Sequence, residues 1–313
     1  MNLSIIIPCY NSEKFLSRTL QMLLNEKLDN TEIILINDGS TDQTAKIIRD
    51  YSCKTNRIKF IDKENEGVSK ARNDGLSIAQ GKFIYFLDSD DAIESGTIDF
   101  FNKLISENDD IDFFAFGYKS MRSNKVVKNY QNLSQDYKYF TSKEIQTLFF
   151  LKKINLNICS ALFKNEILRE NRLVFTNGVK IGEDVEFIIK YLKLIKKALY
   201  RSRLCFNYLL RDDSATQGYS SYSKAQFESF QLFKKLLSDN ELQNEKNFFI
   251  ANCYISNLYR YFISDLSDIE LNKAFVENKA ILRKYWKVNS MRALLLKFFN
   301  ILPIKILLRI KKY

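Results

Sequence analysis

KFIYFLDSDDA, residues 82–92, runs an apolar segment directly into three carboxylates, Asp88, Asp90 and Asp91. Ionised carboxylates this close together repel, and each favours either its neutral form or a cationic partner. The apolar part has the length of a buried strand, and the acidic part follows where that strand should end. This stretch therefore predicts a buried strand whose carboxyl end binds a cation.

The residues around this stretch alternate short apolar runs with helical patterns. Strands are expected at 3–7, 32–36, 58–61 and 82–87. Asn11 or Ser12 can cap the first helix, and a helix over 68–79 should end at Gly81. Pro8 should end the first strand, because proline cannot donate to a ladder. The alternation predicts an α/β fold with a Rossmann-like, mostly parallel sheet and helices on both faces.

Three polar clusters follow three of these strands. They are PCYN at 8–11, NDGSTD at 37–42 and DSDDA at 88–92. Ligands of parallel sheets bind outside the carboxyl ends of the strands, so the clusters should meet at one edge. Each cluster alone has an ordinary explanation; for the second, Gly39 makes a turn and Ser40 or Thr41 caps a helix. Together they predict a polar binding site.

The side chains in these clusters suggest specific chemistry. Asp88 and Asp90, at i and i+2, point the same way and can share a divalent cation. Oxygen ligands favour Mg²⁺ or Mn²⁺, and the chain contains no histidine to compete. The alternative is an Asp-rich turn that caps the next helix, and Asp91 is undecided between ligand support and cap. Asp38 is placed to accept from the N–H of a uracil-like base.

Two further motifs supply charged side chains. KARND at 70–74 either leaves its basic residues in solvent or brings Arg72 to a diphosphate or a base. Glu183 and Asp184 open a predicted helix over 183–198. Carboxylates there either favour the helix dipole or include a general base that deprotonates a hydroxyl nucleophile. Without histidine, a carboxylate is the candidate for that base.

The length and the cysteines limit the class of protein. At 313 residues the chain should form one large domain plus an appendage, divided at 1–215 and 216–313. Its five cysteines are scattered, which indicates reduced thiols in a cytoplasmic protein. The first residues predict a strand and not a signal peptide.

The positive charge is concentrated at the end of the chain. From residue 278 onwards there is no acidic residue, and the basic ones are Lys279, Arg283, Lys284, Lys287, Arg292, Lys297, Lys305, Arg309, Lys311 and Lys312. The remainder is near neutral although the formal net charge is +11. The segment 290–313 has no uncharged run near the ~20 residues that span a bilayer. It predicts an amphipathic anchor on anionic lipid; packing on the body or on a dimer partner is the alternative, and a nucleic acid fits an aliphatic tail least.

SIIIPCYNSEKFL, EIILINDGSTDQT, NEGVSKARNDGLSIAQGKFIYFLDSDD and GEDVEF occur in this order, and together they resemble the family 2 glycosyltransferases. These are bacterial enzymes of the GT-A fold that assemble capsule, exopolysaccharide and lipopolysaccharide. The resemblance covers about 3–100 and resumes at 159–215. It implies an inverting, Mn²⁺- or Mg²⁺-dependent hexosyl transfer from a UDP-sugar to a hydroxyl of a saccharide acceptor. The basic tail adds the expectation of a lipid-linked acceptor at the inner face of the cell membrane.

The resemblance also implies roles for individual residues. The base and ribose pocket would be lined by Pro8, Tyr10, Asn11, Glu13 and Asp38. Arg72 and Asn73 would lie near the nucleotide. Asp88, Ser89 and Asp90 would hold the ribose and, through the two carboxylates, the metal. Asp184 would be the catalytic base beside Glu183, and Arg211 with Ser214 would close a loop over the diphosphate.

Two departures refine this interpretation. Asn37 stands where the family often has a first acidic residue, which alters the base or ribose contacts. The chain has neither a Q-x-x-R-W signature nor a run of transmembrane segments, so we expect it to add one sugar or few. Residues 1–100 would form the nucleotide-binding half of the domain and 101–215 the acceptor half.

Two alternative functions stay open. They are a sugar-nucleotide nucleotidyltransferase and a non-catalytic protein that binds the membrane surface.

Overall fold

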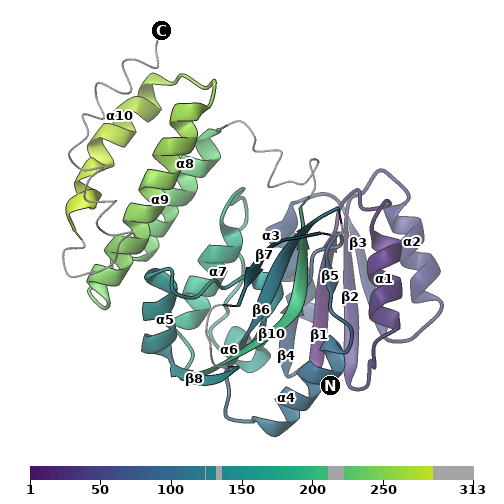
Figure 1. Ribbon diagram of the computed structural model, residues 1–313. Coiled ribbons are helices and arrows are strands. Elements are labelled where there is room, and N and C mark those ends of the chain that lie inside the picture. Colours follow the sequence, from purple (N-terminus) through teal and green to yellow (C-terminus); the bar gives the residue numbers. More distant parts are fainter. Residues whose placement is uncertain (124, 132–135, 211–221, 285–313) are drawn as a thin grey trace. The chain divides into compact units, whose positions relative to one another are not determined.

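The computed structural model describes residues 1–123, 125–131, 136–210 and 222–284 (Figure 1). The strands are β1 (Leu3–Cys9), β2 (Thr31–Asp38), β3 (Ile58–Lys63), β4 (Phe83–Phe86), β5 (Ala92–Ile93), β6 (Phe113–Arg122), β7 (Lys125–Tyr130), β8 (Tyr137–Thr141), β9 (Ala161–Lys164) and β10 (Lys197–Leu209). The α-helices are α1 (Leu16–Leu24), α2 (Thr44–Ser52), α3 (Val68–Ile78), α4 (Thr97–Glu107), α5 (Ser142–Phe150), α6 (Asn165–Glu170), α7 (Glu183–Leu192), α8 (Lys224–Leu236), α9 (Gln243–Ile263) and α10 (Ile269–Asn278). The described residues also form the short 3₁₀ helices η1 (Ile158–Ser160) and η3 (Lys279–Arg283).

One mixed sheet organises the strands in the order β3-β2-β1-β4-β9-β6-β10-β5, with β7 on β6 and β8 on β10. The first four strands pair in parallel, as the alternating pattern predicts. Beyond them β9 runs antiparallel to both β4 and β6, and β10 runs parallel to β6. The carboxyl ends of β1 to β4, β6 and β10 therefore meet at one edge of the sheet, here called the carboxyl edge. The predicted α/β class is confirmed.

Helices cover both faces of the sheet. Adjacent side chains of a strand point to opposite faces of the sheet, so the contacts of Tyr85 and Phe86 in β4 show which helix covers each face. Tyr85 packs edge-on against Phe101 of α4, and Phe86 packs edge-on against Phe187 of α7. All four rings are buried. Helices α4 and α7 thus lie on opposite faces, and α7 begins at the carboxyl edge.

Strand β1 continues through Pro8 to Cys9, so the expectation that Pro8 ends it is wrong. The Ile6 carbonyl accepts from Leu87 N, just beyond the end of β4. Backbone groups two residues apart in a strand point toward the same neighbouring strand, so the backbone nitrogen of Pro8 also points toward the β4 side. The β4 ladder has already ended there, at Ile6 and Phe86. The missing N–H of Pro8 therefore leaves no acceptor unpaired.

Local predictions about four helix ends are also wrong. The helix expected over 183–198 ends at Leu192, because the Asp112 carboxylate accepts from Lys196 N and Lys197 N and the chain there starts β10. Gly81 does not end α3 in a left-handed turn; a Cβ there would lie 2.4 Å from Ser4 N. The predicted caps of α1 and α2 are not made either.

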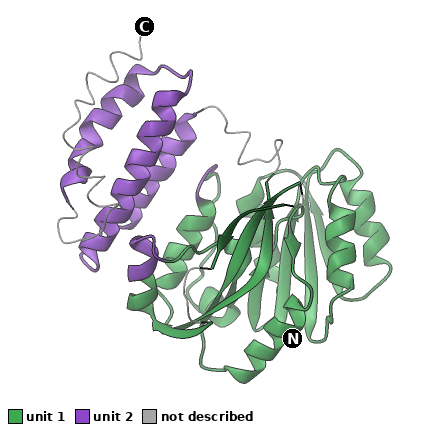
Figure 2. Cartoon of the chain, viewed as in Figure 1, with its two compact units in different colours: residues 1–146, 154–179, 183–210 green, residues 147–153, 180–182, 211–313 purple. Residues whose placement is uncertain are grey.

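The chain divides into two compact units, which Figure 2 colours separately. The first consists of residues 1–146, 154–179 and 183–210 and contains the sheet. The second consists of 147–153, 180–182 and 211–313, and in it Phe227, Tyr254 and Tyr261 pack around Phe275. The domain boundary predicted at residue 215 falls outside the described residues.

Neither a bilayer-spanning helix nor a disulfide occurs in the part of the chain that the structure describes. Its helices are not both long and apolar enough to cross a bilayer. All five cysteines lie in the described ranges and are free thiols, as their scattered positions predict.

Candidate active site

Arg72 is the centre of the carboxyl edge. Its side chain is 4% exposed and lies on α3, which follows β3. The guanidinium donates to Asp88 Oδ1 at 3.0 Å and to Glu183 Oε1 at 3.2 Å. Burial alone would lower the pKa of Arg72, but the two carboxylates raise it above its usual value. One buried cation therefore joins two acidic motifs that are far apart in the sequence.

The ring of Phe175 packs against the Arg72 guanidinium. Its buried ring lies 5.2 Å from the Arg72 guanidinium and stacks on Phe187 of α7, with centroids 4.1 Å apart and planes 7° apart. Asn73 holds the same segment: its amide donates to the Phe175 carbonyl at 2.9 Å and accepts from Phe175 N at 2.8 Å. The contacts of Asn73 are thus with the protein itself, and they position the ring under Arg72.

Glu183 and Asp184 begin α7 at this edge. Burial raises the pKa of Glu183, the neighbouring Asp184 adds to the rise, and Arg72 opposes it. Burial likewise raises the pKa of Asp184 against the opposing charge of Arg72. The Asp184 carboxylate accepts from Val185 N at 2.7 Å. A carboxylate with a raised pKa holds a proton more readily, which is what a general base requires.

The DSDD loop places its carboxylates in different environments. Asp88 and Asp90 are partly exposed, whereas Asp91 is buried and accepts from Leu209 N at 2.9 Å. Burial, with the charge of Asp88, raises the pKa of Asp91 well above its usual range. No helix starts directly after it, so Asp91 neither caps a helix nor faces solvent. It anchors the loop to β10.

Potential metal-binding atoms of three residues lie close together at this loop, and Asp90 is not among the three. Oxygens of Asp88 and Asp91 and the sulfur of Cys159 lie within 4.8 Å of one another. Burial raises the pKa of the Cys159 thiol well above its usual value, and a protonated thiol is a poor metal ligand. The partly exposed carboxylates of Asp88 and Asp90 are the oxygen donors that Mg²⁺ or Mn²⁺ prefers.

Asp38 lies at the end of β2, as predicted, but its carboxylate is buried and engaged. Its oxygens accept from Glu66 N at 3.0 Å, from Gly67 N at 2.8 Å and from Lys63 Nζ at 3.0 Å. These contacts tie the start of α3 to β2, and through α3 they support Arg72. Lys63, at the end of β3, was not among the predicted residues, although a cation at a strand end beside acidic clusters is a usable signal.

The first cluster connects two loops of the carboxyl edge. Asn11 Oδ1 accepts from Thr41 N at 2.9 Å, and Glu13 Oε2 accepts from Gln43 N at 3.0 Å. Ser89, also a predicted site residue, is buried and shares a hydrogen bond with Ser12 at 2.7 Å. Tyr10 and Pro8 precede these contacts, and the Tyr10 ring is 54% exposed. The predicted residues of this cluster thus lie together, with one aromatic ring open to solvent.

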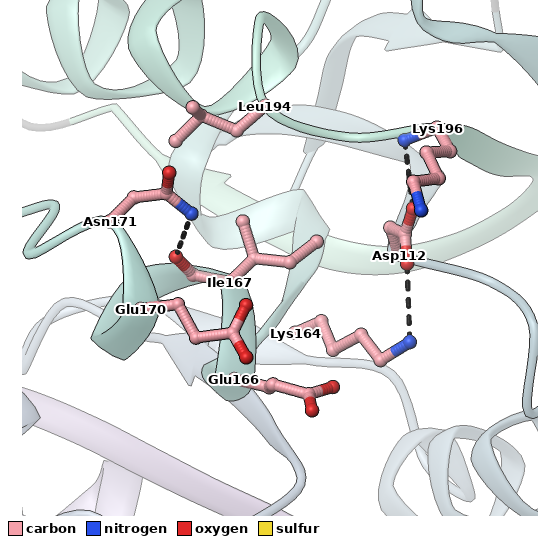
Figure 3. A pocket seen from close by; sticks show the side chains of 8 residues that line it. All are labelled: Asp112, Lys164, Glu166, Ile167, Glu170, Asn171, Leu194 and Lys196. Carbon is pink, nitrogen blue, oxygen red and sulfur yellow. Dashed lines mark hydrogen bonds and ion pairs between the residues drawn. The ribbon is translucent and has the colours of Figure 1, made fainter.

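A cavity of about 310 Å³ lies elsewhere, at the opposite edge of the sheet (Figure 3). Asp112 precedes β6 and Lys196 precedes β10, and both line it together with Lys164, which ends the antiparallel β9. The Asp112 carboxylate accepts hydrogen bonds from Lys164 Nζ at 3.2 Å and from Lys196 N at 2.8 Å. It therefore holds the ends of two strands together. The cavity is therefore separate from the carboxyl edge.

Arg211 and Ser214 lie outside the described residues, so their predicted place over a diphosphate stays a prediction. Phe175 was missed altogether. A single phenylalanine between helices has no sequence signal that sets it apart from the core, and only its contact with Arg72 reveals its position at the site.

The mixed α/β sheet with helices on both faces has the GT-A fold. The glycosyl transferase family 2 model matches residues 4–171, and the chain belongs to this family. Among the alternatives that the sequence left open, the family match supports a glycosyltransferase.

Relatives and solved structures agree with this assignment. Glycosyltransferase GlyA of Streptococcus pneumoniae is 28% identical over 69% of this chain and 31% of its own length. The poly(ribitol-phosphate) beta-glucosyltransferase of Bacillus spizizenii is 31% identical over 68% of this chain and 33% of its own length. The chain thus spans about a third of these relatives. A crystal structure of S. aureus TarS 1–349 with UDP-GlcNAc has a TM-score of 0.71 at 21% identity, covers 99% of this chain and 88% of its own, and shows the shared fold.

Proposed function

We propose that the protein transfers a hexose from a UDP-sugar to a hydroxyl of a saccharide acceptor, with inversion, in the synthesis of a cell-surface polymer. The observation that supports this best is Arg72, bound to both Asp88 and Glu183. It brings the predicted metal and diphosphate carboxylates beside the predicted base. Relatives named for teichoic acid biosynthesis and for poly(ribitol-phosphate) glucosylation support a surface polymer as the product.

The donor nucleotide would bind over the loops after β1 and β2. Tyr10 offers an open ring for stacking on a base, and Pro8, Asn11 and Glu13 shape the surrounding loop. Asp38 supports this pocket by fixing the start of α3. Two crystal structures of S. aureus TarS, in complex with UDP-GlcNAc and with UDP, support a uridine nucleotide as the donor.

Asp88 and Asp90 would hold Mn²⁺ or Mg²⁺. When bound, such an ion supplies positive charge that stabilises a leaving diphosphate. Arg72 would contribute a fixed positive charge at the same edge, and its rigidity follows from its two carboxylate partners and the Phe175 ring. Ser89 would keep the loop in place through Ser12.

Asp184 would act as the general base. It accepts the proton of the acceptor hydroxyl while that oxygen attacks the anomeric carbon from the face opposite the diphosphate. The C–O bond to the acceptor forms as the bond to UDP breaks, so one displacement inverts the anomeric centre. Glu183 would orient the acceptor and, through Arg72, keep the two halves of the site in register.

The most informative experiment is a donor screen. UDP release is measured from a panel of UDP-sugars with Mn²⁺, with Mg²⁺ and with a chelator, each in the presence and absence of saccharide acceptors. We expect one donor to be used, and release to fall to background with the chelator. Turnover that is unaffected by chelation would contradict the role of Asp88 and Asp90, and release from no UDP-sugar would contradict the donor class.

The basic segment 290–313 would place the enzyme on the inner face of the cell membrane, beside a lipid-linked acceptor. This segment lies outside the described residues, and its amphipathic, cationic composition supports the assignment. Docking on the body or on a second copy in a homodimer is the competing outcome. We propose no nucleic-acid partner. Residues 1–215 would form the catalytic domain, with 1–100 as its nucleotide half and 101–215 as its acceptor half, and 216–313 the helical region.

A further inference from the structure

One face of α7 is turned toward the chain segment that carries Phe175. Glu183, Glu186 and Phe187 are three and four residues apart, so they share this face of the helix. Glu183 binds Arg72 at 3.2 Å. Phe187 stacks on Phe175. Glu186 stands between these two contacts, and the proposed mechanism gives it no role.

Glu186 closes a ring of three polar side chains with Thr176 and Lys190. The Thr176 hydroxyl donates to Glu186 Oε1 at 2.9 Å and accepts from Lys190 Nζ at 2.9 Å. Lys190 Nζ also lies 2.7 Å from Glu186 Oε1. These three residues are called here the Thr176 triad. Because Thr176 directly follows Phe175, the triad fixes the Phe175 segment to α7.

Helix α3 binds the same segment from its other side. The Asn73 amide donates to the Phe175 carbonyl and to Asn177 Oδ1, and it accepts from Phe175 N. Arg72 precedes Asn73 on α3, whereas Asp184 belongs to α7. The segment therefore connects the helix of the buried arginine to the helix of the proposed base.

Stability alone is a poor explanation for the burial of Glu186. Its side chain is 4% exposed, whereas that of Lys190 is 29% exposed. The Glu186 Oε2 atom is buried and accepts no hydrogen bond from the residues that the structure describes. Apolar side chains of similar volume often stabilise a fold as well as a buried ion pair does, but the ion pair can hold one arrangement. An ordinary helix pair four residues apart is the competing explanation, and it gives no reason for the bond to Thr176.

We propose that the members of the Thr176 triad are positioning residues for the transfer reaction. By holding Phe175 on α7, the triad keeps the ring against the Arg72 guanidinium and keeps this cation at a fixed distance from the proposed base. The triad acts through these groups and does not touch the substrate. The inference rests on the proposed function, because it takes Asp184 as the base of a sugar transfer.

A second triad of the same kind provides a matched control. Ser4 Oγ donates to Glu32 Oε1 at 2.6 Å, and Lys59 Nζ lies 2.8 Å from the same carboxylate. The Glu32 side chain is 2% exposed. Ser4 pairs with Glu32 near the amino ends of β1 and β2, away from the carboxyl edge. The two triads thus share their chemistry and their burial, but not their distance from the site.

The test compares variants of the two triads in the full chain. Glu186→Gln, Thr176→Val and Thr176→Ser alter the first triad, and Glu32→Gln and Ser4→Ala alter the second. UDP release is measured with the UDP-sugar that the parent protein turns over fastest, which gives kcat and the KM for the donor. The Kd of UDP, the free energy of unfolding and the hydrogen exchange of residues 173–179 are measured alongside.

We expect Glu186→Gln and Thr176→Val to lower kcat about tenfold and to change the KM for the donor and the Kd of UDP less than about twofold, because a displaced group costs rate more than binding. Thr176→Ser keeps the hydroxyl and should retain most of the parent kcat. Amides of residues 173–179 should exchange faster in Thr176→Val. Glu32→Gln and Ser4→Ala should lose stability but keep the parent kcat and the parent exchange of this segment.

Equal losses of kcat in Glu186→Gln and Glu32→Gln would overturn the proposal, and so would a Glu186→Gln variant that loses stability but keeps kcat. A loss in Thr176→Ser as large as in Thr176→Val would show that the hydroxyl is not what matters. If Glu186→Gln does not fold, Thr176→Val decides, since it removes one hydroxyl and keeps the shape of the side chain. Failure of the parent to release UDP from any UDP-sugar would contradict the proposed function, and unchanged exchange of residues 173–179 in Thr176→Val would still overturn the triad.

Discussion

Arg72 and Glu183 are 111 residues apart in the sequence, yet their side chains meet at 3.2 Å inside the protein. The contact joins α3, which follows the third strand of the parallel half, to the start of α7. Since Arg72 also binds Asp88, the position of the predicted base depends on the same cation as the predicted metal loop.

Replacing Asp184 by asparagine should slow transfer strongly and preserve donor binding. The amide keeps the size of the side chain but cannot accept a proton, so we expect the rate to fall by about 10²–10⁴. Glu183→Gln is the matched variant, and it should retain more activity because Glu183 is not the base. Rates and UDP affinity are measured side by side. Full activity of Asp184→Asn would show that another group takes the proton.

Replacing Arg72 by methionine should destabilise the protein and weaken diphosphate binding together. The substitution leaves Glu183, 16% exposed, and the more exposed Asp88 without their cation, at a cost of about 3 kcal/mol in the free energy of unfolding. Lys82→Met removes an exposed pair with Asp109 and should leave the unfolding midpoint unchanged. The free energy of unfolding of both variants is measured by urea denaturation. Equal midpoints for the two would mean that the buried pair adds no stability.

The pH dependence of activity should show a base with a raised pKa. Because burial raises the pKa of Asp184, the acid limb of the rate profile should lie above the ordinary aspartate value of about 3.9. An acid limb at or below that value would contradict the environment described here. The profile is measured with saturating donor.

The same raised values predict how stability changes with pH. The folded state binds the protons of Glu183 and Asp184 more tightly than the unfolded chain does. Their contribution is fully present below about pH 4, the unfolded pKa range, and is lost as the pH rises through the folded values. Glu183→Gln with Asp184→Asn should therefore flatten the decline in melting temperature between pH 4 and pH 8. An unchanged slope would assign the decline to other groups.

Phe175→Leu should lower the rate more than it lowers donor affinity. The change keeps an apolar side chain but removes the ring under Arg72 and its stack on Phe187, worth about 2 kcal/mol of stability together. Phe227→Leu is the control, since its ring packs on Phe275 in the second unit. The Phe227→Leu variant should be less stable, but each folded molecule should transfer sugar at the parent rate. The same loss of rate in both variants would make Phe175 an ordinary core residue.

Gly75→Ala sets two effects of opposite sign against each other. Alanine is favoured over glycine in a helix by about 1 kcal/mol. At this position, however, its Cβ would lie 2.4 Å from Cγ2 of Ile6, and overpacking of a core costs about 1–3 kcal/mol. We expect a net loss in the free energy of unfolding, partly restored by adding Ile6→Leu, which removes the Cγ2 methyl. A gain in stability from Gly75→Ala alone would mean that helix propensity prevails.

The sequence by itself determined the α/β class, the parallel strands of the first half and the carboxylates at their ends. These features are local: short apolar runs make buried strands, and the polar residues that follow them must lie at the carboxyl edge. It also pointed to Arg72 and the Glu183–Asp184 pair as separate candidates.

Only the tertiary structure decided which of these side chains meet. Strand β9 enters between β4 and β6 out of sequence order, and this insertion is not coded in any local pattern. The pairing of strands and the packing of α7 determine that Arg72 reaches both Asp88 and Glu183, and that Asn73 holds Phe175. The same long-range contacts turn Asp91 inward onto β10 and allow Pro8 to remain in a strand. Spacing along a chain predicts neighbours on one helix or strand, whereas neighbours across the sheet depend on the free energy of the whole fold.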